Sequence, residues 1–276
     1  MVCLSQTAYI ERLAEKFGLG SAKPVRSPQF HHERMSKIET DEAKINDPKL
    51  PYREIVGSLQ YLVVCTRPDL ANAVRTLGRY TSAYTVENYR AAQRVVRYAL
   101  ATKEMGLVYR FTPGFPAMDA FYDADHQSCP DTSRSVTGYM LRLHGNMWMW
   151  KSHGQRRVTE DTCSSELVAC CECSKMVVWA RELLLELGFG ERTLQVPIYC
   201  DIQSAIAVVA NNGNTSRVRH MAKHARFINE YVQEKELDVV YVSSTENCAD
   251  VFTKALGPAE FERQRSRLNI EDVTDA

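Results

Sequence analysis

The clearest chemical signal in the sequence is the run Ala120 to Asp125, in which apolar and aromatic residues lead into two carboxylates. Aspartate is disfavoured inside a strand because its short polar side chain competes with the backbone for hydrogen bonds. A buried carboxylate stays ionised only with a charged partner, hydrogen bonds or a metal ion. Asp123 and Asp125 at the end of a core strand therefore require an explanation. Three later carboxylates are candidates to supply it: Glu166, Asp201 and Asp250.

Composition limits the classes of protein to consider. The chain has 276 residues, with 34 Lys and Arg against 34 Asp and Glu, so its net charge is zero. Bulk charge thus gives no sign of a strongly basic nucleic-acid binder, and any such surface must be local. No run of 18 apolar residues exists, and the amino terminus lacks a basic segment leading into an apolar core. These features predict a soluble, intracellular protein without a membrane span.

The nine cysteines favour free thiols over a metal or disulfide framework. Their number is odd, and Cys170 with Cys173 forms a lone CxxC that no second Cys or His pair at zinc spacing accompanies. We expect reduced, mostly buried thiols.

The first half of the chain has helical periodicity. Helices are expected within residues 1–20, with Ser5 as N-cap, and at 69–81 and 86–102. A further helix carries Ile55, Leu59, Leu62 and Val63 on one face. The helix at 86–102 presents a ridge of three arginines, which is either a solvated face or a set of phosphate contacts: Arg90, Arg94 and Arg97.

After the Pro/Gly cluster at 112–116 the pattern changes to short strands separated by helices. The order of elements is β-β-β-α-β-α-α-β-α, which indicates a mixed sheet with helices packed on it. The strands are expected at 119–123, 137–143, 146–151, 195–200 and 237–242, with a hairpin at 144–146. The helices are expected at 162–187, from 203 to a stop at Gly213, at 218–234 and at 247–256, with a last helical stretch at 258–268.

This order, and a series of motifs along nearly the whole chain, resembles the carboxyl-terminal part of the copia-type (Ty1/copia) retrotransposon Pol polyprotein. The motifs that carry the resemblance are Leu4–Gln6 with Tyr9–Ile10, residues 52–70, Arg94–Tyr98 with Thr102, Tyr122–Asp125, Thr137–Tyr139, Trp150–Ser152 with Gln155, Asp201 with Gln203–Ile206, and Ala249–Asp250 with Thr253–Lys254.

The resemblance implies a fold class and two domains. Residues 1–112 would be the mostly helical end of a reverse transcriptase, thumb- or connection-like. Residues 117–276 would be an α/β ribonuclease H-like domain with a mixed five-stranded sheet. No Tyr-x-Asp-Asp motif is present, so the polymerase palm would lie upstream and this chain alone should not synthesise DNA.

The resemblance also implies a metal site. The four ribonuclease H carboxylates fall on Asp123, Glu166, Asp201 and Asp250, which would hold two Mg²⁺ or Mn²⁺ ions for in-line phosphoryl displacement. His220 is a candidate proton shuttle. Taken singly, each carboxylate also has a structural explanation: Asp201 as a helix cap, Asp250 as a partner of its helix dipole, Glu166 as a solvated helix residue and Asp123 as the end of a strand.

The chain departs from the family pattern around these positions. His126 stands where Trp is usual, Ser128 where Gly is common, Ser164–Leu167 where Glu-Ala-Glu-Tyr is usual, Ile202 where Asn is usual, and Arg219–Ala222 where Lys-His-Ile-Asp is usual.

Two functional hypotheses follow. The first is an enzyme, a ribonuclease H that cuts the RNA strand of an RNA–DNA hybrid. The second is a weak or inactive retroelement remnant that only binds nucleic acid; an integrase-like nuclease fits the order Asp, Glu, Asp, Asp less well. The expected partners are an RNA–DNA hybrid and the rest of the Pol polyprotein, without a membrane, in the cytoplasm (virus-like particle) or nucleus. Candidate phosphate contacts are Lys151, Arg156, Arg157, Arg217, Arg219, His220, Lys223, His224 and Arg226.

Overall fold

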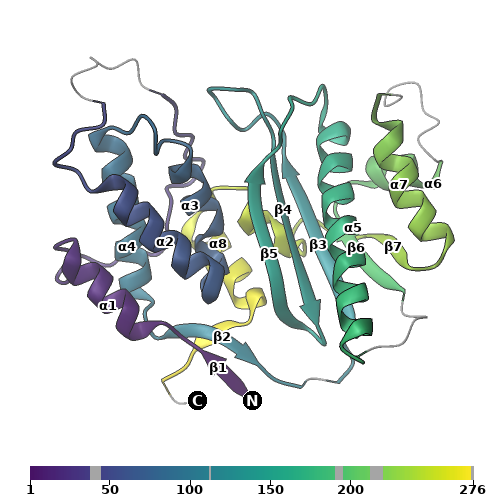
Figure 1. Cartoon of the computed structure of the whole chain (residues 1–276), viewed down its shortest axis with the longest axis horizontal. Coiled ribbons are helices and arrows are strands. Elements are labelled where there is room, and N and C mark those ends of the chain that lie inside the picture. Colours follow the sequence, from purple (N-terminus) through teal and green to yellow (C-terminus); the bar gives the residue numbers. More distant parts are fainter. Residues whose placement is uncertain (38–44, 112, 190–194, 212–219, 275–276) are drawn as a thin grey trace. The chain divides into compact units, whose positions relative to one another are not determined.

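The computed structural model describes residues 1–37, 45–111, 113–189, 195–211 and 220–274 (Figure 1). The chain divides into two compact units. The first unit is Met1–Arg110 with Lys254–Ala276, and the second is Phe111–Thr253. Among the described helices, none combines the length and the apolar character that crossing a membrane would need.

The first unit is mostly helical, as its periodicity predicts. The apolar stripe of the second helix is buried, with Ile55, Leu59 and Leu62 fully inaccessible. Ser5 is not the N-cap of the first helix, because the preceding strand holds the chain extended and the helix begins after Gln6, which makes no side-chain cap. The helices are α1 (Thr7–Lys16), α2 (Tyr52–Cys65), α3 (Ala71–Gly78) and α4 (Val86–Ala101), with a 3-10 turn η2 (Pro68–Leu70) between α2 and α3.

A small antiparallel sheet in the first unit has no signal in the sequence. Its strand order is β1-β2-β8, so its two outer strands come from opposite ends of the chain. Each strand is only three to five residues long, too short for a periodic pattern. The strands are β1 (Val2–Leu4), β2 (Met105–Tyr109) and β8 (Ile270–Asp272).

The carboxyl-terminal residues pack in the first unit, not in the second as the predicted bounds 117–276 have it. The physical reason is their contacts, since β8 pairs with β2 and Phe261 packs edge-on against Tyr98 at 5.5 Å between ring centroids. Arg265 Nη1 donates to Tyr98 Oη at 3.0 Å. This segment contains α8 (Pro258–Arg265) and the 3-10 turn η5 (Ser266–Leu268).

A buried ion pair lies at the centre of the first unit. The Arg67 guanidinium donates two hydrogen bonds to Asp69, at 2.9 Å to Oδ1 and 2.8 Å to Oδ2. Tyr98 Oη donates a third to Asp69 Oδ2 at 2.7 Å. Both charged side chains are fully inaccessible to solvent. Burial alone would raise the pKa of Asp69, but the adjacent Arg67 outweighs it and holds that pKa below its ordinary value.

The second unit is built on a five-stranded sheet in the order β5-β4-β3-β6-β7. The first three strands run antiparallel, whereas β6 lies parallel to β3 and β7 parallel to β6. This confirms the predicted mixed five-stranded sheet. The strands are β3 (Met118–Asp125), β4 (Val136–Leu143), β5 (Asn146–Gly154), β6 (Val196–Cys200) and β7 (Leu237–Tyr241).

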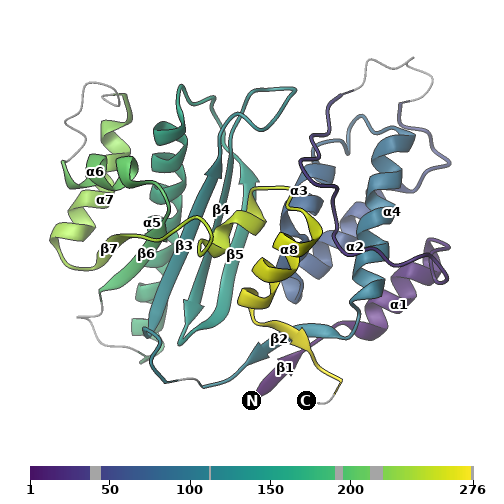
Figure 2. The ribbon, with the colours of Figure 1, turned by 180° about the vertical axis from the view of Figure 1, so that it is seen from behind.

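Helices cover one face of this sheet (Figures 1 and 2). Alternate residues of β3, such as Ala120 and Tyr122, point into a core shared with Leu167 and Cys170 of the long helix and Ile228 of the last one. The helices are α5 (Thr162–Glu186), α6 (Gln203–Ala210) and α7 (Ala222–Gln233). The predicted helix stop at Gly213, and the start of a helix at 218, lie outside the described residues.

The predicted helix at 247–256 is shorter and of another type. Only a 3-10 helix, η4 (Cys248–Phe252), forms there, begun by Asn247, whose side chain accepts from the Ala249 N–H at 3.1 Å. The Thr253 N–H bonds to the Asp250 carbonyl three residues back, which closes the turn instead of continuing an α-helix.

Candidate metal centre

Two neighbouring parallel strands bring two of the predicted carboxylates side by side. In the β3–β6 pair, Phe121 lies opposite Tyr199. Two residues further along each strand direction come Asp123 and Asp201. Because parallel strands keep a constant register, the two carboxylates reach the same edge of the sheet.

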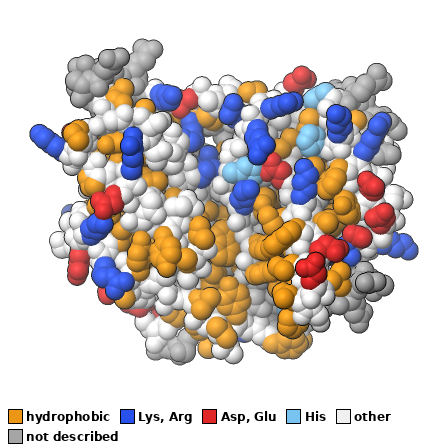
Figure 3. All heavy atoms as spheres, viewed as in Figure 1, with side chains coloured by type: hydrophobic (Ala, Val, Ile, Leu, Met, Phe, Trp, Pro, Cys, Tyr) orange, Lys and Arg blue, Asp and Glu red, His pale blue; other side chains and the backbone are white. Residues whose placement is uncertain are grey.

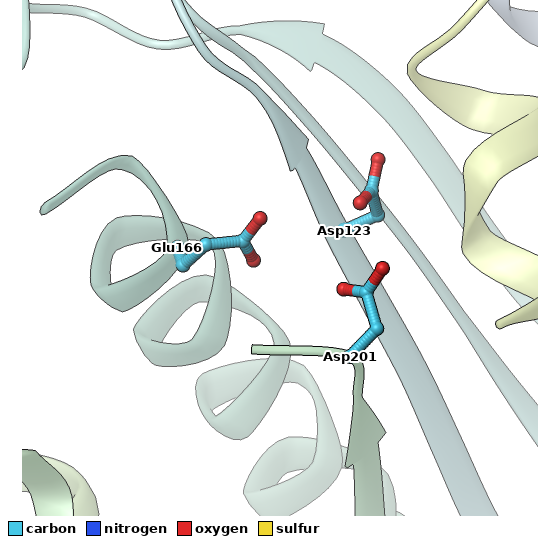
Figure 4. Close-up of side chains that lie close together, drawn as sticks. All are labelled: Asp123, Glu166 and Asp201. Carbon is cyan, nitrogen blue, oxygen red and sulfur yellow. The ribbon is translucent and has the colours of Figure 1, made fainter. Parts of the chain in front are cut away.

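Glu166 enters this edge from the first turns of α5. Carboxylate oxygens of Asp123, Glu166 and Asp201 all lie within 4.8 Å of one another. Figure 4 shows the three side chains directed toward a common point from β3, from α5 and from the end of β6. The structure therefore brings together three of the four predicted ligands.

The three carboxylates are withdrawn from solvent, which is costly for charged groups. Asp123 and Glu166 are each 1% exposed, and Asp201 is half-buried. Asp123 Oδ2 accepts a short hydrogen bond from Thr253 Oγ1. Glu166 Oε1 accepts a longer hydrogen bond, of 3.3 Å, from the Ala124 N–H. Within the described part of the chain, the buried Oδ1 of Asp201 has no hydrogen-bond partner. Hard oxygen ligands arranged in this way fit Mg²⁺ or Mn²⁺.

A glutamine from one of the sequence motifs fixes the start of α5. Gln155 Nε2 donates to Thr137 Oγ1 at 3.1 Å and to the Ser165 carbonyl at 2.9 Å. Because Ser165 immediately precedes Glu166, these bonds hold the helix start against β4. Asp161 caps the same helix by accepting from the Ser164 N–H at 2.6 Å.

Asp250 lies outside the group of three. It is 8% exposed and sits on η4, which packs against β3 and β4. Its link to the group is Thr253, whose Oγ1 lies 3.2 Å from the Asp250 carbonyl and bonds Asp123. As a metal ligand, Asp250 stays a prediction.

A glycine in β4 allows η4 to pack close to Asp123. Gly138 of β4 lies opposite Asp123. A Cβ at this glycine would lie 2.7 Å from both Phe252 Cβ and Thr253 Cγ2, which is sterically forbidden without movement. The absence of a side chain at residue 138 is therefore what lets Thr253 reach Asp123.

His220 lies near the start of α5, outside the carboxylate group. Its Nε2 is 3.3 Å from Ser164 Oγ, two residues before Glu166. The side chain is exposed and borders a cavity of about 900 Å³ beside β5, α5 and α7. The proton-shuttle role of His220 stays a prediction.

The same cavity collects many of the predicted basic residues. Figure 3 shows Lys, Arg and His side chains gathered over β5 and α5. Burial, followed by the nearby charge of Lys175, lowers the pKa of His224 in this cavity. Of the predicted phosphate contacts, Arg217 and Arg219 lie outside the described residues, while Lys223 and Arg226 are exposed on α7. The cavity is lined by Lys151, Arg156 and Arg157 together with His220 and His224.

Sequence reasoning assigned no role to Thr253, Gln155, Asn247 or Gly138. The first, second and fourth of these belong to the motifs quoted above, but a hydroxyl, an amide or a missing side chain gives no sign of its partner before the fold is known. Asn247 joins the site through its Nδ2, which donates to the Tyr122 carbonyl at 3.0 Å, directly before Asp123.

The second unit is therefore an α/β domain with a mixed five-stranded sheet and a three-carboxylate candidate metal site. No protein-family model matches the chain. It is 36% identical over 94% of its length to the retrovirus-related Pol polyprotein from transposon TNT 1-94 of Nicotiana tabacum. It is 34% identical over 98% of its length to the corresponding polyprotein from transposon RE1 of Arabidopsis thaliana. The matches cover 19% and 18% of these relatives, so the chain spans about a fifth of their length.

The chain is thus similar to a part of the copia-type retrovirus-related Pol polyproteins. Among solved structures, it is similar to LC11-RNase H1 isolated from compost, with a TM-score of 0.37 and 13% identity over 50% of this chain and 94% of that one. RNase H1 from Halobacterium salinarum gives a TM-score of 0.34 and 16% identity over 52% and 97% of the two chains.

Proposed function

We propose that this chain is a ribonuclease H, a two-metal-dependent endonuclease that cleaves the RNA strand of RNA–DNA hybrids. The observation that carries the proposal is the meeting of Asp123, Glu166 and Asp201 oxygens within 4.8 Å. Three like charges gather in this way where a cation offsets their repulsion. The occurrence of this carboxylate group in a chain similar to Pol polyproteins favours a phosphodiester as the substrate.

In this proposal the chain holds its ligands rigidly before substrate arrives. Asp123 and Asp201 are fixed by the two central strands, and Glu166 by the hydrogen bonds that anchor α5. Bound Mg²⁺ or Mn²⁺ would supply the positive charge that readies a water and stabilises the leaving 3′-oxygen. Asp250 would complete the ligand set from η4, and His220 would move a proton near Ser164.

The first unit is proposed to derive from the end of a reverse transcriptase, thumb- or connection-like. The family's polyproteins are several times longer than this chain, so we expect the polymerase palm and the other partners to come from the rest of such a polyprotein. The expected location is the cytoplasm, within a virus-like particle, or the nucleus.

The test is cleavage of an end-labelled RNA–DNA hybrid by the purified chain with Mg²⁺ or Mn²⁺. We expect cuts within the RNA strand, none in matched RNA or DNA duplexes, and none by Asp123→Asn. The alternative, an inactive remnant, is supported by the drift around the site, such as Ile202 in place of Asn. It predicts hybrid binding without any metal-dependent cut, and that outcome would replace the proposal.

His220→Ala separates a chemical role from a structural one. A proton shuttle predicts slower cleavage and an altered pH–rate profile, whereas a surface histidine predicts neither. Since His220 is exposed and contacts only Ser164 among the hydrogen bonds that the structure gives for it, the melting temperature should not change in either case.

A further inference from the structure

A second cavity, of about 650 Å³, lies in the first unit and has no part in the proposed chemistry. It is bounded by α4 on one side and by the segment that follows α1 on the other. The arginine ridge of α4 faces it, with Arg90, Arg94 and Arg97 all among its lining residues. The ridge is therefore part of a concave surface and not only a solvated helix face.

Arg94 is held in place inside this cavity. Its guanidinium lies 3.8 Å from the centroid of the Phe30 ring, a stacked cation–π contact, and Nη2 lies 3.4 Å from Ser27 Oγ. The side chain is half-buried, and its Nε is buried with no hydrogen-bond partner in the described part of the chain. A guanidinium stacked on an aromatic ring is pre-organised, and its donors lie in a plane that matches the oxygens of a phosphate.

The other two arginines follow Arg94 along the helix. The spacing 90, 94, 97 puts all three on one face, separated by about 6 Å and about 4.5 Å along the axis. Arg97 Nε donates to the Lys23 carbonyl at 2.9 Å, which ties the loop after α1 to the ridge. Arg90 is exposed.

The charges that line the cavity are mainly positive. Four cationic side chains, those of the ridge and Lys23, stand against the carboxylates of Glu33 and Glu87. Glu33 accepts from the Phe30 N–H at 3.2 Å, and burial raises its pKa. The cavity therefore has an excess of positive charge around one pre-organised arginine.

We propose that this cavity binds phosphate groups of a nucleic-acid backbone, with Arg94 as the central contact and Arg90 and Arg97 beside it. The chemistry recognised is a phosphate oxyanion. The choice of a nucleic acid as its carrier rests on the proposed function of the second unit. A linear ridge of three arginines suits successive phosphates of a strand, and such contacts position a nucleic acid without reading its sequence.

The experiment measures binding of the full chain to a labelled RNA–DNA hybrid in EDTA, so that no cleavage can occur, at several salt concentrations. Arg94→Gln should weaken binding about tenfold, and each lost phosphate contact should lower the magnitude of the salt slope by about 0.9. Arg94→Lys should recover only part of the loss, because lysine keeps the charge but not the planar fork. The matched control is Arg12→Gln, which removes one exposed positive charge on α1 and should leave both quantities unchanged.

Glu33→Gln tests the sign of the effect. It removes a negative charge from the cavity wall while keeping an acceptor for the Phe30 N–H, so binding should tighten a few-fold. Unchanged affinity and salt slope in the variant lacking all three ridge arginines would overturn the proposal.

Inorganic phosphate is the second probe. One outcome is that phosphate raises the melting temperature in an Arg94-dependent way while hybrid affinity does not depend on the ridge arginines. The cavity then binds a free anion, and the nucleic-acid proposal fails. Failure here is distinct from failure of the proposed function. If the variant lacking the three ridge arginines binds and cleaves hybrids normally, only the phosphate-binding proposal is refuted. If binding depends on the ridge but no cleavage occurs, only the proposed nuclease function is refuted.

Discussion

Each of the two units buries acidic side chains, but in opposite ways. In the first, both oxygens of Asp69 are matched by the Arg67 guanidinium and by Tyr98 Oη. In the second, three carboxylates point toward one another, and their hydrogen bonds include one from a hydroxyl to Asp123 and one from a backbone N–H to Glu166. The first arrangement is complete within the chain. The second places like charges together, which favours an added cation.

The difference separates two meanings of a buried carboxylate. The Asp69 pair serves the fold, because burial is offset by the adjacent arginine and the charge is neutralised locally. Without a bound cation, the charges of the group around Asp201 add little to the stability of the fold. The role of this group is therefore in binding. Removing one charge of the Arg67–Asp69 pair should therefore lower stability, whereas removing one carboxylate charge of the group around Asp201 should leave the metal-free fold as stable or slightly more stable.

The largest effect is expected for Arg67→Met. The substitution leaves Asp69 buried without its ion-pair partner, and breaking such a pair costs about 3–5 kcal/mol. Urea unfolding of wild type, of Arg67→Met and of the exposed control Arg12→Met gives the free energies of unfolding to compare. A loss no larger than that of the exposed control would mean that this pair is not what stabilises the unit.

Gly138→Ala should show that the second site depends on close packing. The new Cβ would meet Phe252 and Thr253 at 2.7 Å, and overpacking of this kind costs about 1–3 kcal/mol. We expect lower stability together with slower hybrid cleavage. The matched control is Gly154→Ala on β5, where nothing lies within 4 Å of the added Cβ. Equal effects at the two glycines would refute the role given to residue 138.

The pH dependence of the free energy of unfolding should show the contribution of the Asp69 carboxylate. Its pKa is lowered in the folded state, so between its folded and unfolded pKa values the unfolded chain binds more protons. The stabilisation is therefore fully present above about pH 4, the ordinary range of an aspartate, and is lost as pH falls through the folded pKa. Urea titrations from pH 6 to pH 3 should show a steeper decline for wild type than for Asp69→Asn. Parallel curves would count against the pair.

The smallest effect is expected beside the metal site. Ile202 occupies the N-cap position of α6 and provides no side-chain cap. Ile202→Asn restores the residue usual in the family and a preferred cap, which should stabilise the second unit by about 1 kcal/mol. Ile202→Ala is the control, since it shortens the side chain without adding an acceptor. If Asn and Ala give the same unfolding curve, the cap has no role here.

Periodic segments and motif order were sufficient to predict most of the second unit. The apolar and aromatic run that ends at Asp125, and the change of pattern after the Pro/Gly cluster at 112–116, predicted its strands, and the mixed sheet is confirmed. The three carboxylates that meet were predicted from the family resemblance, which the expected strand ends at Asp123 and Asp201 and the long helix at Glu166 support. The positions of Asp250 and His220 outside that group depend on the packing of η4 and of the residues before α7, which no local pattern encodes.

The first unit was less predictable at its edges. Its helices follow from apolar stripes such as that of Ile55, but the three-stranded sheet depends on pairing between residues more than 100 apart in sequence. The return of the carboxyl terminus to this unit depends on Phe261 packing on Tyr98, a tertiary contact without a sequence signature. The ion pair of Arg67 and Asp69 was visible only as a helix break around Pro68.

The central claim is that Asp123, Glu166 and Asp201 hold divalent metal. The most direct measurement is calorimetric titration of Mn²⁺, with thermal melting in parallel, for wild type, Asp201→Asn and the exposed control Asp238→Asn. We expect wild type and Asp238→Asn to bind Mn²⁺ and to gain about 2.7 kcal/mol at a hundredfold excess over Kd. Asp201→Asn should lose both signals while its metal-free fold is as stable as wild type or slightly more so. Full Mn²⁺ binding and full stabilisation in Asp201→Asn would contradict the account.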